Sequence, residues 1–137
     1  MAWWPSRPRR VVGRSSARCC PRRTRRRRSP SRVHCSYRWI ADDGDLVGFL
    51  AIRHALNDFL REEGGHIGYS VRPSRRREGH ATLALALALA EARALGIERA
   101  LVTCDTDNVA SARTIERNGG VLEDVRHGKR RYWIDLA

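Results

Sequence analysis

The sequence has no acidic residue in its first 41 positions, although 13 of its 27 Lys and Arg residues lie there. The other 14 basic residues share residues 42–137 with all 15 acidic ones, which gives that part of the chain a balance of −1. The formal charge of +12 and the high pI therefore describe the N-terminal end alone. This distribution argues against a domain that binds nucleic acid over its whole surface.

Long apolar runs are also missing. The longest, residues 81–90, has about half the length that a membrane-spanning helix needs, and Thr82 interrupts it. The N-terminal end lacks the apolar h-region of a secretory signal peptide. Its Arg- and Ser-rich, acid-free composition is nevertheless typical of organelle transit peptides, and that alternative stays open. We expect no association with a membrane.

The four cysteines lack the spacing of a zinc site, because no CxxC pair occurs. Cys19 and Cys20 are neighbours, which rarely bond to each other, and Cys35 and Cys104 stand apart. A metal site built from Cys19, Cys20, His34 and Cys35 is less favoured than unconstrained thiols, so no metal is predicted. Nothing in this pattern indicates an oxidising compartment, and the cytoplasm is the expected location.

Residues 1–36, here called the leader, contain four of the five prolines and the run Arg-Arg-Thr-Arg-Arg-Arg-Arg at residues 22–28. Charges of one sign at this density repel each other, and few apolar side chains are present to be buried, so we predict disorder. Weak binding to RNA or DNA phosphates, a nuclear address and a transit peptide are alternative roles. We favour a tail without a role, because the composition changes abruptly after it.

Residues 37–137 form a second region, in which strand and helix patterns alternate. The predicted elements are strands over residues 37–40, 46–53, 66–71, 100–104, 121–125 and 131–136, and helices over residues 54–62, 75–95 and 108–118, the last capped by Asp107. Asp43-Gly44 between the first two strands indicates a hairpin. The strand–helix–strand unit over residues 66–104 implies a parallel pair. The fold class is therefore α/β with a mixed sheet.

The longest predicted helix contains an alternation of Leu and Ala over residues 83–90 that imitates a strand. Leu and Ala are strong helix formers and neither is β-branched, so the helix is favoured. On a helix Leu83 lies over Leu87, and Leu85 over Leu89, which leaves the cylinder apolar most of the way round. We expect such a helix to be buried against a sheet.

The loop that joins the strand ending at Val71 to this helix has the properties of an anion site. Backbone N–H groups at a helix N-terminus lack partners, and the helix dipole adds partial positive charge. Gly79 lets the backbone approach a ligand closely, and Arg75, Arg76 and Arg77 bring full charges. A pyrophosphate would suit this loop. It is not a Walker loop, which ends in Gly-Lys-Ser/Thr, nor a dinucleotide fingerprint with three spaced glycines.

Arg76-Arg77-Glu78-Gly79-His80-Ala81 resembles the acetyl-CoA signature Gln/Arg-x-x-Gly-x-Gly/Ala of the GNAT superfamily of N-acetyltransferases. Four further segments follow the order of that family, at residues 68–73, 107–112, 118–120 and 131–136. Bacterial-type members with Arg-His-x-Leu-Asn and Gly-Gly-His-Ile-Gly-Tyr are similar to residues 53–57 and 64–69. The resemblance spans residues 37–137.

The resemblance implies a GNAT-like fold: a mixed, mostly antiparallel sheet with a central buried helix, here lacking the first strand and two helices of the family. It implies transfer of an acetyl group from acetyl-CoA, the co-substrate, to the amine of a small molecule or peptide. By match to the family, the cofactor-binding residues are Val71, Arg76, Arg77, Glu78, Gly79, His80, Ala81, Thr82 and Asn108. Val71 would pair with the pantetheine arm through its backbone.

The catalytic groups are less defined. His66 and Tyr69 lie on or beside the strand before the loop and are the candidates, although strand parity points them to opposite faces. The family's proton-donating Tyr in the last helix is replaced by Ile115. Because the first elements are missing, activity is expected to be weak or absent. A non-catalytic CoA-binding fragment and a nucleic-acid binder acting through the leader are the alternatives. The sequence determines neither the acceptor nor the oligomeric state.

Overall fold

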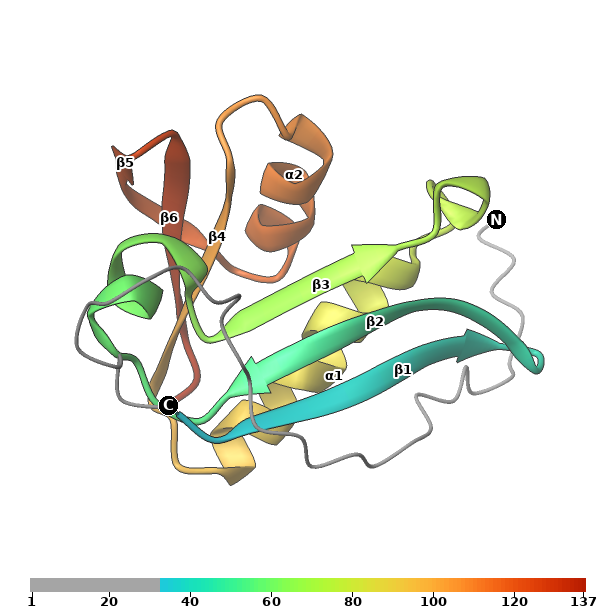
Figure 1. Ribbon diagram of the computed structural model, residues 1–137, viewed down its shortest axis with the longest axis horizontal. Helices are drawn as coiled ribbons and strands as arrows, with labels where there is room; N and C mark the ends of the chain where they lie inside the picture. The colour runs from blue at the N-terminus through green and yellow to red at the C-terminus, as the bar shows by residue number, and fades with distance from the viewer. Residues whose placement is uncertain (1–32) are drawn as a thin grey trace, which may run out of the picture.

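Six strands form one sheet in the computed structural model, which describes residues 33–137 (Figure 1). They are β1 (Cys35–Asp42), β2 (Asp45–Arg53), β3 (Ile67–Val71), β4 (Arg99–Asp105), β5 (Val121–Arg126) and β6 (Lys129–Asp135), in the spatial order β1-β2-β3-β4-β6-β5. Neighbouring strands are antiparallel except β3 and β4, which are parallel. The prediction of a mixed, mostly antiparallel sheet is confirmed. The predictions on residues 1–32 lie outside the described residues.

The β1–β2 hairpin turns at Asp43 and Gly44, whose φ angles are 50° and 81°. Left-handed backbone at both positions is what a tight hairpin requires, and Asp-Gly adopts it at low cost. The hairpin was predicted, but β1 begins at Cys35 instead of residue 37. Its tip carries Asp42 and Asp45, which are important for the site described below.

Helix α1 (His80–Ala94) covers one face of the sheet, where it packs against β2 and β3 (Figure 1). The Leu/Ala alternation is therefore helical, as predicted. Its buried residues after the first turn are Ala84, Leu85, Ala88, Leu89 and Ala92. The prediction that this helix is buried against a sheet is confirmed, although Leu87, on the side away from the sheet, is 44% exposed. The alanines at 84, 88 and 92 let the helix approach the sheet closely on the side that the sheet covers.

The predicted helix over residues 54–62 is present only in its second half, because residues 58–64 are helical and residues 54–57 are not. A short π-helical turn, η1 (Leu60–Gly64), stands near its end, where the Asn57 side chain accepts a hydrogen bond from the Leu60 N–H (2.9 Å). Phe59 is 59% exposed. The Arg53 guanidinium donates to the carbonyls of Gly64 (2.8 Å) and Gly65 (3.1 Å) and so fixes the end of this helical turn.

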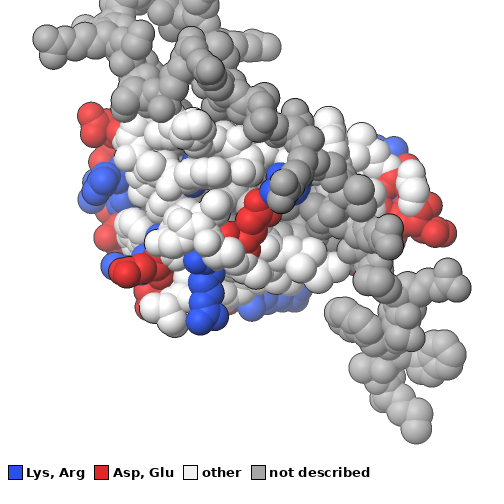
Figure 2. Space-filling model, turned by 90° about the horizontal axis from the view of Figure 1, so that it is seen from below, with Lys and Arg blue, Asp and Glu red and all other residues white. Residues whose placement is uncertain are grey.

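Helix α2 (Val109–Arg117) lies on the same face as α1 and contacts it. Its cap is Asn108, whose Oδ1 accepts from the Ser111 N–H at 3.1 Å, so the prediction that Asp107 caps the helix is wrong. Basic and acidic side chains lie beside each other on the face drawn in Figure 2, in keeping with the near-balanced charge of residues 42–137. No helix within residues 33–137 is long and apolar enough to cross a bilayer.

Candidate functional site

Strands β3 and β4 separate soon after they meet. Their one paired position is Ile67 with Val102, although β3 continues to Val71 and β4 to Asp105. Residues 68–71 of β3 and 103–105 of β4 therefore form a fork, in which neighbouring parallel strands share no further ladder pairs (Figure 1). Backbone groups along this fork are available to an added chain, because a strand edge without a partner presents N–H and C=O groups.

Backbone alternation decides which groups of β3 face the fork. The Arg72 N–H donates to β2, and the His66 carbonyl accepts from β2, both at 2.7 Å. Because backbone groups of alternate residues point to opposite sides of a strand, those of Tyr69 and Val71 point toward β4. The Val71 carbonyl accepts from Arg76 Nε at 3.1 Å. Val71 thus lies on β3 with its backbone groups directed toward the fork, and its carbonyl already accepts a hydrogen bond from the loop.

The loop after β3 begins with a single 3₁₀ turn, η2 (Pro73–Arg75), and ends at Gly79, the N-cap of α1. Arg77 and Gly79 are left-handed, with φ of 64° and 82°. The first helical bond of α1 runs from the Leu83 N–H to the Gly79 carbonyl (3.1 Å). Within residues 33–137, no hydrogen bond reaches the backbone N–H groups of Arg77, Gly79, Ala81 and Thr82. The predicted anion-binding amides are therefore open.

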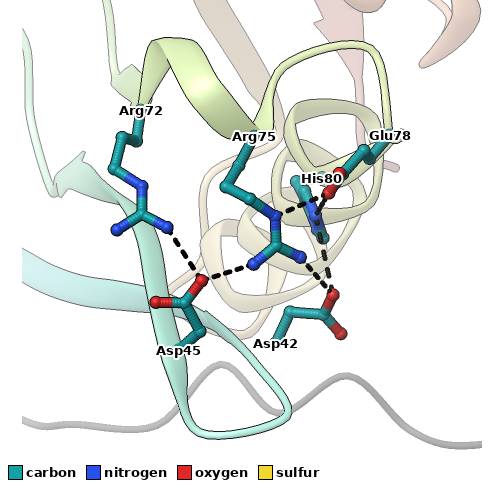
Figure 3. A network of polar contacts seen from close by, with 6 residues as sticks. All are labelled: Asp42, Asp45, Arg72, Arg75, Glu78 and His80. Atoms are coloured by element: carbon teal, nitrogen blue, oxygen red, sulfur yellow. Dashed lines mark hydrogen bonds and ion pairs between the residues drawn. The ribbon is translucent and has the colours of Figure 1, made fainter.

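The positive charge of Arg75 does not add to the anion site formed by these amides, contrary to the expectation from the sequence. Its guanidinium donates to Asp42 Oδ2 (2.7 Å), to Asp45 Oδ2 and to Glu78 Oε2 (2.9 Å), as Figure 3 shows. Arg72 adds a second cation on Asp45, at 2.8 Å. The sequence places Asp42 and Asp45 some 30 residues before the loop, so no local pattern could reveal this pairing.

His80 lies beneath the loop and is 3% exposed. Its Nε2 lies 2.7 Å from Glu78 Oε2 and 3.8 Å from Asp42 Oδ2. His80 and then Arg75 hold the pKa of the Glu78 carboxyl below its usual value. Asp42, Glu78 and His80 have ligand atoms within 4.8 Å of one another, which is the geometry of a small metal site. Both carboxylates, however, already bind the Arg75 guanidinium.

His66 is 7% exposed, and it bonds to a part of β4 that precedes the fork. Its backbone N–H donates to the Leu101 carbonyl (2.7 Å), and its Nδ1 accepts from the Leu101 N–H (2.9 Å). Burial, followed by the nearby Arg53 and Arg61, lowers the pKa of His66 to about 4. The ring is therefore neutral near pH 7, and its proton is on Nε2. His66 can donate there, but Nδ1 is not available as a base.

Tyr69 points toward α2, where its hydroxyl lies 2.7 Å from Ser111 Oγ. Burial raises the pKa of Tyr69, so the phenol keeps its proton at neutral pH. His66 and Tyr69 thus contact different elements, and the structure does not bring the two candidates together. Sequence reasoning missed Ser111. Its place three residues after the helix cap was the available signal, since such a residue faces back over the N-terminus.

Three residues in and at the ends of α2 make contacts that stabilise the fold. Asn108 Oδ1 is used in capping α2. Ile115 is fully buried in the core, so this position does not face the fork. Asn118 was predicted only as a helix end, but its Nδ2 donates to the Thr82 carbonyl at 3.2 Å. It thereby fastens the first turn of α1 to the end of α2.

Comparison with known proteins gives a family. The model of the Acetyltransferase (GNAT) family matches residues 2–120, beginning within the leader, whereas the resemblance of the motifs began at residue 37. No curated protein sequence matches the chain significantly.

Several solved structures share the fold. The structure of yncA from Salmonella typhimurium, which contains acetyl-CoA, is 18% identical with a TM-score of 0.62, over 75% of this chain and 65% of that one. The N-acetyltransferase PseH of Campylobacter jejuni with acetyl coenzyme A is 12% identical, with a TM-score of 0.57 over 75% and 69%. The GNAT domain of S. lividans PAT is 14% identical, with a TM-score of 0.62 over 74% and 60%. The chain thus spans less than two thirds of the length of yncA. The family match, which covers most of the chain, shows that this protein belongs to the GNAT family of acetyltransferases.

Proposed function

We propose that this protein is an N-acetyltransferase that transfers the acetyl group of acetyl-CoA to an amine of a small molecule or peptide. The observation that carries the proposal is the junction of two features: the fork between β3 and β4, and the open N–H groups where the loop enters α1. The fork offers a strand edge that can pair with an extended arm of a ligand. The open N–H groups offer an anion site that can bind a diphosphate. We also propose a cytoplasmic location, since Cys104 is a buried free thiol.

The residues present fit acetyl-CoA. We assign the diphosphate to the backbone N–H groups of residues 77–82 and to the exposed Arg76 and Arg77 side chains. The backbone N–H of Arg76 is already bonded to the Pro73 carbonyl (3.4 Å). Glu78 and His80 would contribute their backbone alone, because their side chains bind each other. Val71 would pair with the pantetheine arm once Arg76 Nε releases its carbonyl. Asn108 would use its Nδ2, since Oδ1 caps α2.

Acetyl-CoA supplies an activated acyl group, and a neutral amine attacks its carbonyl carbon. The protein must orient the amine, stabilise the negative charge on the oxygen and protonate the thiolate that departs as the C–S bond breaks. The proton that the amine nitrogen loses on forming the C–N bond passes to water. We assign the first two tasks to the fork, where the backbone of Tyr69 faces β4. The Tyr69 hydroxyl, kept protonated by burial, is the proposed proton donor. We assign His66 a positioning role, because its Nδ1 holds β4.

A second candidate is a protein that binds acetyl-CoA without transferring the acetyl group. One observation favours it: Ile115 is buried where the family has its acid. Both candidates predict binding, and only the first predicts turnover.

The test uses the full chain with acetyl-CoA, by calorimetry for binding and by chromatography of released CoA for turnover on a panel of amines. Gly79→Ala forces a Cβ into left-handed backbone beside the open amides, and loss of a charge-assisted bond predicts roughly tenfold weaker binding. Gly96→Ala is the matched control, since Gly96 (φ 86°) follows the other end of α1 and also has open space. Equal affinity in both variants, or no binding by the parent, would contradict the proposal. Binding without turnover on any amine would favour the second candidate.

A further inference from the structure

The Arg75 guanidinium joins two distant parts of the chain. It lies between three carboxylates: Asp42 and Asp45 at the tip of the β1–β2 hairpin, and Glu78 in the loop (Figure 3). The Arg75 side chain is 22% exposed and Asp42 is 24% exposed, so this contact is partly shielded from water. All three nitrogens of the guanidinium have a carboxylate partner. The charge of Arg75 is therefore neutralised by carboxylates of the protein itself.

The Arg75–Glu78 contact spans the most strained point of the loop. Between these two residues lies Arg77, whose φ of 64° is unfavourable for a residue with a side chain. Such a conformation persists only where the surroundings hold it. Arg75 is fixed from outside by the hairpin, and Glu78 is fixed from below by His80 at 2.7 Å. The two ends of the strained turn are therefore anchored separately, and the anchors meet at Arg75.

We propose that Arg75 is a positioning residue that fastens the loop to the β1–β2 hairpin and so holds its backbone N–H groups open for the diphosphate. This inference rests on the proposed function, and it assigns the hairpin a part in cofactor binding. Arg76 and Arg77 are the side chains left to meet the ligand. Arg75 acts through Glu78 and the turn at Arg77, without touching the cofactor.

Acid-to-amide variants at the hairpin distinguish positioning from direct contact by the sign of their effect. If Arg75 bound the diphosphate, Asp42→Asn and Asp45→Asn would free its charge and tighten acetyl-CoA binding. If Arg75 positions the loop, both variants weaken binding, by about threefold to tenfold, as does Arg75→Gln. In the Arg75→Gln background the Asp45→Asn change then adds little, because the two act through one contact. Asp135→Asn is the matched control, since Asp135 pairs with Arg99 elsewhere at 2.9 Å. Tighter binding in the hairpin variants would overturn the proposal.

Amide hydrogen exchange gives a second readout that needs no ligand. The hydrogen-bonded amides at the two ends of the loop are those of Arg76, which donates to Pro73, and Leu83, which donates to Gly79. Their exchange in the free protein should rise in Arg75→Gln and in Asp45→Asn, and stay unchanged in Asp135→Asn. Unchanged exchange in Arg75→Gln would refute the anchoring even if affinity fell. Failure of the parent to bind acetyl-CoA would instead refute the proposed function, and the exchange rates would still decide whether Arg75 holds the loop.

Discussion

Lowering the pH from 7 to 5 should destabilise this protein through His66. In the folded state the pKa of His66 is lowered to about 4 from the ordinary 6.5, because the ring is buried near Arg53 and Arg61. Between these two values the unfolded chain binds a proton that the folded protein refuses. The contribution of His66 to stability is therefore complete above pH 6.5 and is lost as the pH falls toward 4.

The magnitude follows from the two pKa values. Linkage over pH 7 to 5 gives about 2 kcal/mol of lost unfolding free energy for this one group. Arg53 is partly exposed and Arg61 is exposed, so solvent screens their share of the shift. We therefore expect roughly 1–2 kcal/mol. Most carboxylates stay ionised in this pH range, which keeps their contribution small.

The assay is urea unfolding at several pH values from 5 to 7, for the parent and for His66→Asn. The Asn amide oxygen lies near the position of Nδ1 and can still accept from the Leu101 N–H, but it does not titrate. The other histidines are common to both proteins, so the difference between the two pH profiles isolates His66. Parallel profiles would show that His66 titrates normally in the folded protein. Nδ1 of His66 would then not be held by the Leu101 N–H.

Three further predictions concern the fork and the core. Tyr69→Phe should lower kcat by on the order of a hundredfold with unchanged acetyl-CoA affinity, as steady-state kinetics and calorimetry would show; a matching loss of affinity would contradict the donor role. Ile115→Tyr should not restore an acid and should cost about 1–3 kcal/mol, because the site is fully buried; higher turnover in this variant would refute this. Gly48→Ala should lower the melting temperature far more than Gly44→Ala, since its Cβ would lie 2.1 Å from the Ser70 carbonyl oxygen and the Gly44 Cβ meets no atom within 4 Å. Equal melting temperatures would show that β2 and β3 can separate without cost.

Local chemistry was sufficient for much of the fold. The Leu/Ala run became a helix because backbone propensity outweighs a period-two pattern when no residue is β-branched. Asp43-Gly44 turned the hairpin, since few other pairs accept left-handed backbone at two positions. Gly79 at the start of α1 marked the open amides for a similar reason. These features depend on residues close in sequence, and their outcome could be predicted without coordinates.

Competing partners decided where prediction failed. Residues 54–62 have an apolar pattern suited to a helix, but the helix begins only at residue 58, where the Asn57 side chain accepts from the Leu60 N–H. Two adjacent residues could cap α2, and the cap is Asn108 rather than Asp107. In each case the outcome depended on which of several possible contacts formed, and the local sequence pattern does not distinguish between them.

The sequence by itself determined the secondary structure of the central unit and the loop whose amides are open, because these follow from backbone preferences of neighbouring residues. Only the tertiary structure decided what the charges and titratable groups do. It placed Asp42 and Asp45 around Arg75 and set Nδ1 of His66 against β4. Interactions of this kind depend on distance in space and on burial, and neither is encoded in the spacing of residues along the chain.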